Sequence, residues 1–477
     1  MKINEIHKTK IVATVGPACS SYDKLLELVR AGVDVFRLNF SHGSYEDHQK
    51  IIDNILKINE THQTYVSILA DLQGPKLRVG KMENGSMPIQ SGDILTFVNE
   101  ECLGNKEKIY MSYENFSEDV EVGEKVLVDD GKVVLEVIET NKKDLVKLKV
   151  IHGNVLSSNK GVNLPNTKVS LPALTEKDLN DLDYILTQPV NWIALSFVRS
   201  PKDLKDLRDR IDAKNHDAKI IAKIEKPEAI EKLDKIIKHS NAIMIARGDL
   251  GIEIPIEKLP GIQKDIINKC IQRARPVIVA TQMMDSMIEN PTPTRAEVTD
   301  VANAVLDGAD AVMLSGETSV GKFPTLVVET MGKIIGEAEK SQSFDNRHPY
   351  PAPASRTFLS DVVCFNAAKT SDDIGAKAIL GMTSSGYTAF KVSSYRPKAN
   401  VYIFSDKKNM LSTLNLVWGV KCFYYDKFTT TDETIQDCTD ILKEKLMIDT
   451  GDIVVNTGTM PLGKRMRTNM MKVTEIE

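Results

Sequence analysis

Apolar residues along this chain follow two alternating patterns. Short apolar runs of strand length are separated by segments in which apolar residues recur every three or four positions, as on one face of a helix. Eight strands alternating with helices are typical of a TIM (β/α)8 barrel, and residues 1–73 with residues 171–345 have about the right length. The predicted strands are residues 10–16, 34–40, 66–72, 192–197, 220–224, 242–246, 276–281 and 311–314.

The alternation is interrupted once and then gives way to a further domain. Residues 74–170 show strand patterns and Asp-Asp-Gly and Asn turns, which predicts a β-barrel lid domain inserted after the third strand. A proline-rich linker over residues 341–353 precedes a C-terminal α/β regulatory domain, residues 346–477. Its predicted strands are residues 376–383, 400–405, 420–424 and 453–456.

Composition narrows the class of protein. The chain has 477 residues, 42% of them hydrophobic, and a net charge of -5 with no basic tract, so we expect no nucleic-acid partner. Its six cysteines are scattered without metal-ligand spacing, as in a reducing compartment. No signal-like start or 18-residue apolar window occurs, so we expect a cytoplasmic protein without membrane contact.

Charged residues fall where two neighbouring strands end. Lys223 and Glu225 are two positions apart and share one face of a strand, and Arg247 and Asp249 follow the next strand. Catalytic groups lie at this end of TIM barrels, which favours an active site. A buried structural ion pair of Lys223 with Glu225 or Asp249 is the alternative.

Two earlier strands repeat the pattern. Arg37, Asn39 and Ser41 alternate along one strand face, and Asp71 ends the next strand. An Arg37–Asp71 core ion pair is again the structural alternative.

Six motifs at the strand ends and the exit of the insert resemble those of pyruvate kinases, and the resemblance covers essentially the whole chain. They are FRLNFSHG at residues 36–43, KGVNLP at 160–165, KIE at 223–225, ARGDLG at 246–251, ATQM at 280–283 and LSGET at 314–318. The resemblance implies phosphoryl transfer from phosphoenolpyruvate to ADP, which depends on positioning and charge neutralisation.

The resemblance also implies roles for single residues. Glu225 and Asp249 are expected to hold Mg²⁺ or Mn²⁺, and Lys223 and Arg37 to neutralise the transferred phosphoryl group. The backbone at Gly248 and Asp249, with the Thr281 hydroxyl, would bind the substrate carboxylate. The remaining catalytic candidate is a proton donor to the enolate, either Thr281 with a water or Ser315. Thr281 could instead be a satisfied structural hydroxyl.

On the nucleotide side, the resemblance implies that Asn39, His42, Arg78 and Lys160 approach the phosphates of ADP and ATP or a second metal. Lys160 belongs to the lid, which would close over the barrel and exclude water. Lys160 could also be an exposed loop lysine, and His42 a histidine bonded to the backbone.

The monovalent-cation region departs from the potassium-dependent pattern of the family. Asn39, Ser41 and Asp71 match that pattern, but Leu72 replaces a threonine and Lys76 replaces a glutamate. We expect that K⁺ is not required and that the Lys76 ammonium substitutes for the ion, with Asp71 as its neighbour. The alternative is an exposed loop lysine.

A loop after the first C-terminal strand is rich in hydroxyl groups and opens a helix. Its candidates for the phosphate of a sugar-phosphate effector are Thr383, Ser384, Ser385, Gly386 and Thr388. Ordinary helix capping is the alternative. Residues 458–468 depart from the expected effector pattern, which leaves the effector open. The resemblance further implies a homotetramer.

Two other functions remain open at this point. A Mg²⁺-enolate lyase or aldolase would share Glu225 and Asp249 but has no use for the lid, Arg78 or Lys160. A non-catalytic sugar-phosphate sensor would not need the intact Lys223.

Overall fold

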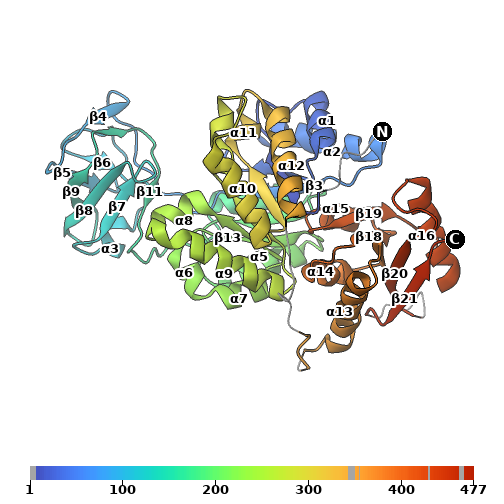
Figure 1. Ribbon diagram of the computed structural model, residues 1–477. Coiled ribbons are helices and arrows are strands. Elements are labelled where there is room, and N and C mark those ends of the chain that lie inside the picture. Colours follow the sequence, from blue (N-terminus) through green and yellow to red (C-terminus); the bar gives the residue numbers. More distant parts are fainter. Residues whose placement is uncertain (1–6, 342–349, 354, 428–429, 461–466) are drawn as a thin grey trace.

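The computed structural model describes residues 7–341, 350–353, 355–427, 430–460 and 467–477. Three parts lie in a row, with a mainly β part at one end, a barrel in the middle and an α/β part at the other end (Figure 1). Most of the predicted linker lies outside the described residues, because residues 342–349 are not among them. The residue limits of the three domains stay predictions.

The middle part is a closed barrel of eight parallel strands. They are β1 (Lys10–Thr14), β2 (Val35–Asn39), β3 (Ser67–Asp71), β12 (Trp192–Leu195), β13 (Lys219–Ile224), β14 (Ala242–Ala246), β15 (Val277–Ala280) and β16 (Ala311–Leu314). Neighbours follow the order β1-β16-β15-β14-β13-β12-β3-β2. The lid is inserted between β3 and β12, which pair directly, so the barrel closes across the insertion. The TIM-barrel prediction is confirmed.

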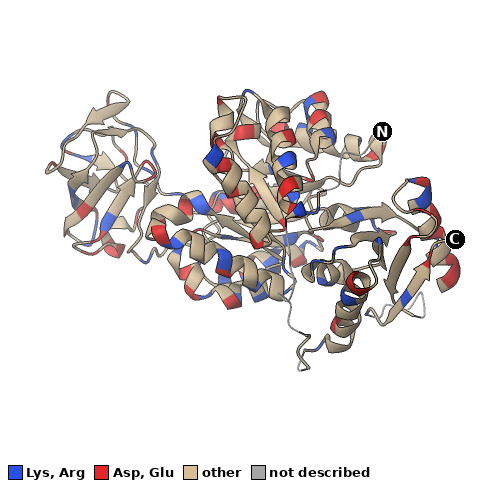
Figure 2. Ribbon diagram, in the orientation of Figure 1, with Lys and Arg blue, Asp and Glu red and all other residues tan. Residues whose placement is uncertain are grey.

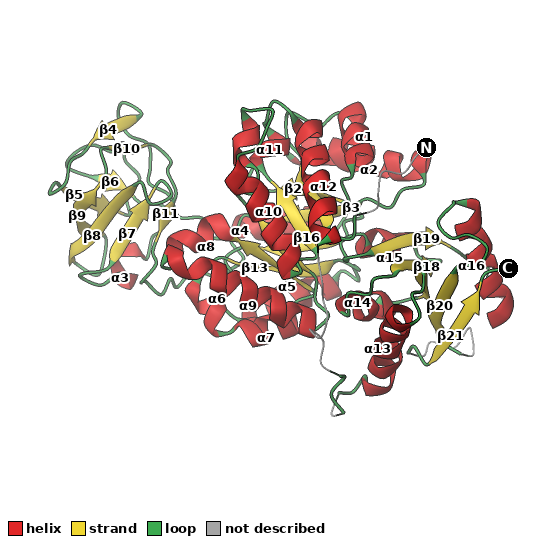
Figure 3. Ribbon diagram, in the orientation of Figure 1, coloured by secondary structure: helices red, strands yellow, loops and turns green. Residues whose placement is uncertain are grey.

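Helices cover the outside of the barrel (Figure 3), and they carry most of the charged residues in this part of the molecule (Figure 2). In α10, the Thr294 hydroxyl accepts from Glu297 N–H and Gly308 ends the helix at φ 100°, a conformation that suits glycine. The helices are α1 (Tyr22–Ala31), α2 (Tyr45–His62), α4 (Glu176–Ile185), α5 (Pro201–Ala213), α6 (Pro227–Glu231), α7 (Leu233–His239), α8 (Arg247–Glu253), α9 (Leu259–Gln272), α10 (Arg295–Asp307), α11 (Gly316–Ser319) and α12 (Pro324–Lys340).

The inserted part is built mainly from strands. They are β4 (Ser86–Pro88), β5 (Ile94–Val98), β6 (Ile109–Tyr110), β7 (Lys125–Val128), β8 (Val133–Thr140), β9 (Leu145–His152), β10 (Val155–Ser157) and β11 (Val162–Asn163), with one short helix, α3 (Phe116–Asp119). A six-stranded sheet has the order β11-β7-β8-β9-β5-β6, and β10 pairs with β4. Single bridges join Arg78 to Gly161, beside β11, and Val79 to Met111, beside β6. The segment that contains Arg78 and Val79 therefore connects both edges of the six-stranded sheet, as a barrel requires.

The C-terminal part is a five-stranded sheet with helices. Its elements are α13 (Phe358–Asp373), β17 (Ala378–Met382), α14 (Tyr387–Ser394), β18 (Asn400–Ser405), α15 (Lys408–Leu414), β19 (Val420–Tyr424), α16 (Thr431–Glu444), β20 (Ile453–Gly458) and β21 (Met470–Glu475). The order is β19-β18-β17-β20-β21, and only β21 runs antiparallel. The four predicted strands are present, whereas β21 was not predicted, because its residues are mostly exposed and lack an apolar run.

The C-terminal part closes the amino-terminal end of the barrel. Leu416 belongs to the same buried cluster as Val12 and Leu69 of the barrel interior. Arg396 and Asp310 form a buried bidentate ion pair across this contact, with both N–O distances 3.0 Å. These contacts leave the opposite end of the barrel, where the strands end, free to form a site. Among the described residues, no helix has the length and apolar character needed to cross a membrane.

Candidate active site

The carboxyl ends of β2, β3 and β13 bring four predicted site residues together. Lys223 Nζ lies 3.0 Å from Glu225 Oε1 and 3.4 Å from Asp71 Oδ1, and Arg37 Nη2 lies 2.7 Å from Asp71 Oδ2. The side chains of Glu225 and Asp71 are each only 1% exposed. The ion pairs Lys223–Glu225 and Arg37–Asp71, which the sequence offered as structural alternatives, are both present. Because Asp71 contacts both cations, the four residues form one connected cluster.

In this cluster, burial and the charges of opposite sign shift the pKa values in opposite directions. Burial raises the pKa of Asp71, but the charges of Lys223 and Arg37 outweigh it and hold that pKa below its usual value. Burial would lower the pKa of Lys223, but Asp71 and Glu225 outweigh it and raise that pKa. Burial raises the pKa of Glu225, and the nearby negative charge of Asp249 adds to this rise against the opposing effect of Lys223. The site therefore combines a charged lysine with a crowded pair of carboxyl groups, Glu225 and Asp249.

Two contacts that sequence reasoning missed hold this cluster in place. Ser196, just beyond β12, accepts a 2.8 Å hydrogen bond from Lys223 Nζ and donates one of 2.7 Å to the Leu72 carbonyl. Phe197 N–H donates to Glu225 Oε2 at 2.6 Å. Like Asp71, Ser196 is a polar residue at the end of an apolar strand. The same sequence signal could therefore have identified it as a site residue.

A second group lies around the start of α8. Gly248 N–H donates to Thr281 Oγ1 at 2.8 Å, and Thr281, directly after β15, has φ 69°. The Thr281 hydroxyl itself donates to the Ala280 carbonyl at 2.6 Å, as expected of a satisfied hydroxyl. Arg247 is held away from the cluster by Asp300, at 2.7 Å. The strained backbone at Thr281 fixes its hydroxyl beside α8.

Ser315, the other proposed proton donor, follows β16 and is half-buried. Its N–H donates to Glu317 Oε2 at 2.6 Å, while Glu317 Oε1 accepts from Met284 N–H at 3.1 Å. Burial raises the pKa of Glu317. Glu317 thus ties the end of β16 to the loop after β15, a role that its motif did not reveal.

The carboxylates of Glu225 and Asp249 fit a divalent cation. Burial raises the pKa of Glu225 and the charge of Asp249 adds to the rise, and a bound positive charge would oppose both effects. Within the described ranges, no group of three or more His, Cys, Asp or Glu side chains is arranged to hold a metal. Two protein carboxylates completed by substrate oxygens and water are nevertheless typical of Mg²⁺ sites, which seldom have an all-protein cage.

The predicted nucleotide residues lie in two places. Arg78 and Lys160 are both in the lid, where Arg78 Nη1 donates to the Asn159 carbonyl at 2.9 Å and Lys160 Nζ lies 3.0 Å from Asp129 Oδ1. Asn39 lies at the barrel end, where its Oδ1 accepts from Ser41 N–H at 3.1 Å. His42 is exposed beside them. Lys160 is 39% exposed but ion-paired, so it is not simply a free loop lysine.

Lys76 lies in the cleft between the lid and the barrel. A small cavity of about 40 Å³ there is lined by Lys76 and Asp249 together with Gly161 of the lid. Lys76 is exposed and forms no ion pair with any described residue, and the Asp71 carboxylate is paired with Arg37 and Lys223. That Asp71 neighbours Lys76 stays a prediction. Leu72 is buried, 1% exposed, in the barrel core.

The predicted effector loop connects β17 to α14. Thr383 Oγ1 accepts from Gly386 N–H at 2.8 Å, and Thr388 is buried with its hydroxyl 2.6 Å from that of Thr468. Ser384 and Ser385 are exposed. Thr383 therefore stabilises the turn itself, in line with the capping alternative. Of the departing segment 458–468, residues 461–466 lie outside the described residues.

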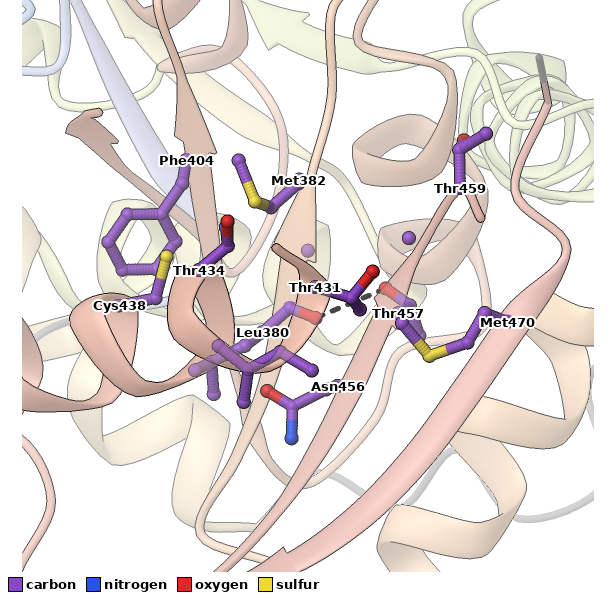
Figure 4. Close-up of a pocket in the computed structure, with 13 residues that line it drawn as sticks. Leu380, Met382, Phe404, Thr431, Thr434, Cys438, Asn456, Thr457, Thr459 and Met470 are labelled. Carbon is purple, nitrogen blue, oxygen red and sulfur yellow. Dashed lines mark hydrogen bonds between the residues drawn. The ribbon is translucent and has the colours of Figure 1, made fainter. Parts of the chain in front are cut away.

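Beside this loop, a small cavity lies at the end of β17 and β20, lined by Met382, Thr457 and residues of α16 (Figure 4). Its volume is about 30 Å³, which leaves room for only a few water molecules. It is too small to hold a sugar phosphate in this conformation.

A (β/α)8 barrel with a buried lysine, arginine and carboxylate cluster at its strand ends defines a barrel enzyme. Residues 6–328 match the family described as pyruvate kinase, barrel domain, and residues 361–474 match pyruvate kinase, alpha/beta domain. The chain belongs to the pyruvate kinase family and is an enzyme of that type.

Individual relatives agree over nearly the full chain. The pyruvate kinase of Geobacillus stearothermophilus is 43% identical over 98% of this chain and 80% of its own length. That of Corynebacterium glutamicum is 42% identical over 98% of this chain and 97% of its own. The crystal structure of a pyruvate kinase from Cryptosporidium parvum superposes with a TM-score of 0.92 at 35% identity, covering 99% of this chain and 96% of that one.

Proposed function

We propose that this chain works in cytoplasmic glycolysis, where it converts phosphoenolpyruvate and ADP to pyruvate and ATP. An ADP β-phosphate oxygen attacks the phosphorus of phosphoenolpyruvate while the bond from phosphorus to the enol oxygen breaks. The enolate left behind takes a proton at its methylene carbon to give pyruvate. The observation that carries this proposal is the connected cluster of Lys223, Arg37, Asp71 and Glu225 at the barrel end.

Lys223 and Arg37 neutralise the phosphoryl group during transfer. Both cations are held by Asp71 and are largely buried, each with 12% of its side chain exposed, so little reorganisation is needed when charge develops. The Ser196 hydroxyl, 2.8 Å from Lys223 Nζ, fixes the ammonium position. Low exposure also strengthens each charge contact relative to water.

Glu225 and Asp249 hold the divalent cation, Mg²⁺ or Mn²⁺. When bound, that cation supplies positive charge to the substrate carboxylate and to the enolate oxygen. The Thr281 hydroxyl and the backbone at Gly248 and Asp249 orient the carboxylate. Because Gly248 N–H bonds to Thr281 Oγ1 in this structure, the substrate has to compete with that hydrogen bond.

Proton delivery and nucleotide binding complete the reaction. Thr281, through a water, or Ser315 provides the proton from the barrel end. Arg78 and Lys160 of the lid, with Asn39 and His42 of the barrel, bind the ADP phosphates when the lid closes over the substrates. Closure excludes water and so protects the phosphoryl group from hydrolysis.

We also propose that the enzyme does not require K⁺. The Leu72 side chain provides no oxygen ligand, and Lys76 lines the same cleft as Asp249, where its ammonium adds a positive charge. The family resemblance further supports a homotetramer and a sugar-phosphate effector at residues 383–388.

The test is pyruvate formation from phosphoenolpyruvate with Mg²⁺, measured with and without ADP. Pyruvate should form only when ADP is present, with one ATP for each pyruvate. Pyruvate formed without ADP, with release of inorganic phosphate, would mean that water accepts the phosphoryl group and would contradict transfer to ADP. No turnover under either condition would favour the lyase, acting on another substrate, or the sensor. Lys219→Met, at the opposite end of β13, is the matched control for Lys223→Met, because it removes a lysine from the same strand without touching the cluster.

A further inference from the structure

A hydrogen bond joins the lid directly to the barrel beside the cleft that separates them. Asn163 Nδ2, in β11 of the lid, donates to Oε1 of Glu253, the last residue of α8, at 2.9 Å. Lys226 Nζ, two residues after β13, lies 2.6 Å from the same oxygen. Figure 1 shows β11 on the side of the lid that is nearest to α8. We call Asn163, Lys226 and Glu253 the lid junction.

The lid junction is buried although it is polar. Asn163 and Lys226 are each 9% exposed, and the Glu253 side chain is fully buried. Glu253 Oε1 accepts both hydrogen bonds, whereas Glu253 Oε2 is buried without a hydrogen-bond partner among the described residues. A buried ion pair contributes little net stability, and an unsatisfied buried oxygen costs free energy. Stability alone therefore does not account for a carboxylate at this position.

On the barrel side, the junction lies next to the residues proposed to bind the metal. Lys226 directly follows Glu225 in the chain. Glu253 is four residues after Asp249, which places both acids on one face of α8. The backbone that carries the two metal carboxylates therefore also carries both barrel members of the junction.

On the lid side, the junction lies next to the residues proposed to bind ADP. Gly161, two residues before Asn163, is bridged to Arg78. Lys160 precedes Gly161 and pairs with Asp129 at 3.0 Å. The position of Asn163 is therefore linked to the positions of both lid cations.

Two other contacts hold the lid at its entry and its exit. At the entry, Gly74 N–H donates to Asp178 Oδ1 at 3.0 Å. At the exit, the Arg199 guanidinium donates to the carbonyls of Val169 and Leu171. A rigid body held at two points can still rotate about the line that joins them. The lid junction supplies a third point, which opposes that rotation.

We propose that Glu253 is a positioning residue for phosphoryl transfer, because its hydrogen bond with Asn163 sets the angle of the lid over the barrel. At that angle, Lys160 and Arg78 meet the phosphates of ADP. Glu253 itself touches neither substrate, and Lys226 keeps its accepting oxygen in place. The inference rests on the proposed function, since it assigns a role in ADP binding.

Steady-state kinetics of the full chain with varied ADP, at saturating phosphoenolpyruvate and Mg²⁺, test this role. Asn163→Ala should raise the KM for ADP about tenfold, as expected when a hydrogen bond to a charged group is lost. Its kcat should stay within about twofold, because the metal site and the transferring cations are intact. A general loss of folding would instead lower kcat and leave the KM for ADP unchanged. Asn154→Ala, at an exposed asparagine of the lid, is the control and should match the unmutated chain.

Exchanging the two polar groups separates the contact itself from the burial of Glu253. Asn163→Asp should raise the KM for ADP more than Asn163→Ala, because it places two carboxylates together. Asn163→Asp combined with Glu253→Gln conserves the charge and restores a donor and an acceptor, since the glutamine amide can donate to the aspartate. This exchange variant should recover at least about fivefold of the KM increase caused by Asn163→Asp. Glu257→Gln, exposed just after α8, is the control for the second substitution.

Three results would overturn the proposal. They are a KM for ADP that changes less than about twofold in Asn163→Ala, a lower KM for ADP in that variant, and no recovery in an exchange variant that melts like the unmutated chain. A lower KM would mean that the contact holds the lid away from ADP. If the unmutated chain forms no pyruvate from phosphoenolpyruvate and ADP, the proposed function fails and this inference fails with it. If the unmutated chain is active and the KM for ADP does not respond, only this inference fails.

Discussion

The ammonium of Lys223 lies 3.0 Å from the carboxylate of Glu225, which follows it by two residues, directly after the end of β13. The Glu225 side chain is 1% exposed and that of Lys223 12%, and Glu225 is also close enough to Asp249 for their charges to interact. A buried pair of this kind is costly to assemble and contributes little net stability. We therefore expect the pair to serve catalysis and not stability. Because Lys223 and Glu225 have different roles, single substitutions should affect the reaction in different ways.

Glu225→Gln should lower kcat at least about 100-fold and raise the Mg²⁺ concentration needed for half-maximal activity, because it removes a charged ligand. Glutamine keeps the size of the side chain, and the buried carboxyl already has a raised pKa, so the fold should remain intact. Glu231→Gln, exposed on α6, is the control. Steady-state kinetics over a Mg²⁺ series measure both effects, and an unchanged Mg²⁺ requirement would remove Glu225 from the metal site.

Lys223→Met should reduce phosphoryl transfer by about 10²–10³-fold or more, because a preorganised charge is lost from the transition state. Exchange of the methyl protons of pyruvate with solvent, followed by NMR, should persist, since it needs the metal and not the lysine. Lys219→Met should leave both reactions intact. Loss of exchange together with transfer would show that Lys223 also acts on the enolate.

Activity should be similar in tetramethylammonium chloride and in KCl at equal ionic strength. Lys76→Glu combined with Leu72→Thr should lose activity without K⁺ and recover part of it when K⁺ is added, because the pair restores two oxygen-bearing side chains. Leu72 is buried in the barrel core, so thermal melting of the double variant must accompany the kinetics. Strong K⁺ activation of the unmutated enzyme would mean that Lys76 does not replace the ion.

Most of the fold could be predicted because the strands of the barrel contain short apolar runs and several of them end in charged or polar residues. The period of apolar residues located all eight strands, and the charges at Arg37, Asp71, Lys223 and Glu225 located the cluster. β21 was missed because an exposed antiparallel edge strand has no apolar signal, and its pairing with β20 is set by tertiary contact.

Contacts between distant segments were the part that sequence could not supply. The pairing of Asp71 with both Arg37 and Lys223 could not be read from the sequence, because it brings together side chains from three strands. The cavity between the amino-terminal end of the barrel and the C-terminal part combines side chains from β13, the loop before β15 and α14, and no local pattern connects them.

Asp310→Asn should lower the apparent free energy of unfolding in urea by about 3–5 kcal/mol, because it leaves the buried Arg396 without its partner. Asp307→Asn is the control: it removes a carboxylate from an ion pair with the exposed Lys264 and should cost less than about 1 kcal/mol. Equal losses in the two variants would show that the Arg396–Asp310 pair does not join the domains.

Lys421, in β19, offers a test by pH. Burial, with the charges of Lys10 and Lys445, lowers the pKa of Lys421 from 10.5 to about 8. The folded state thus disfavours the charged lysine, and this cost is fully present below pH 8 and fades as pH rises from 8 towards 10.5. Lys421→Met should therefore melt higher than the unmutated chain near neutral pH, with a difference that shrinks above pH 8. A difference in melting temperature that does not change with pH would contradict the lowered pKa of Lys421.

The position of Leu416 in the barrel interior has a consequence for synthesis of the protein. During synthesis, α12 emerges from the ribosome well before residue 416. The nascent chain therefore contains all eight barrel strands while the amino-terminal end of the barrel still exposes apolar side chains. Until the last third of the chain emerges, that opening is a binding surface for chaperones and for other unfinished chains. Truncations that end after α12 should therefore aggregate, even though they contain every residue of the transfer site.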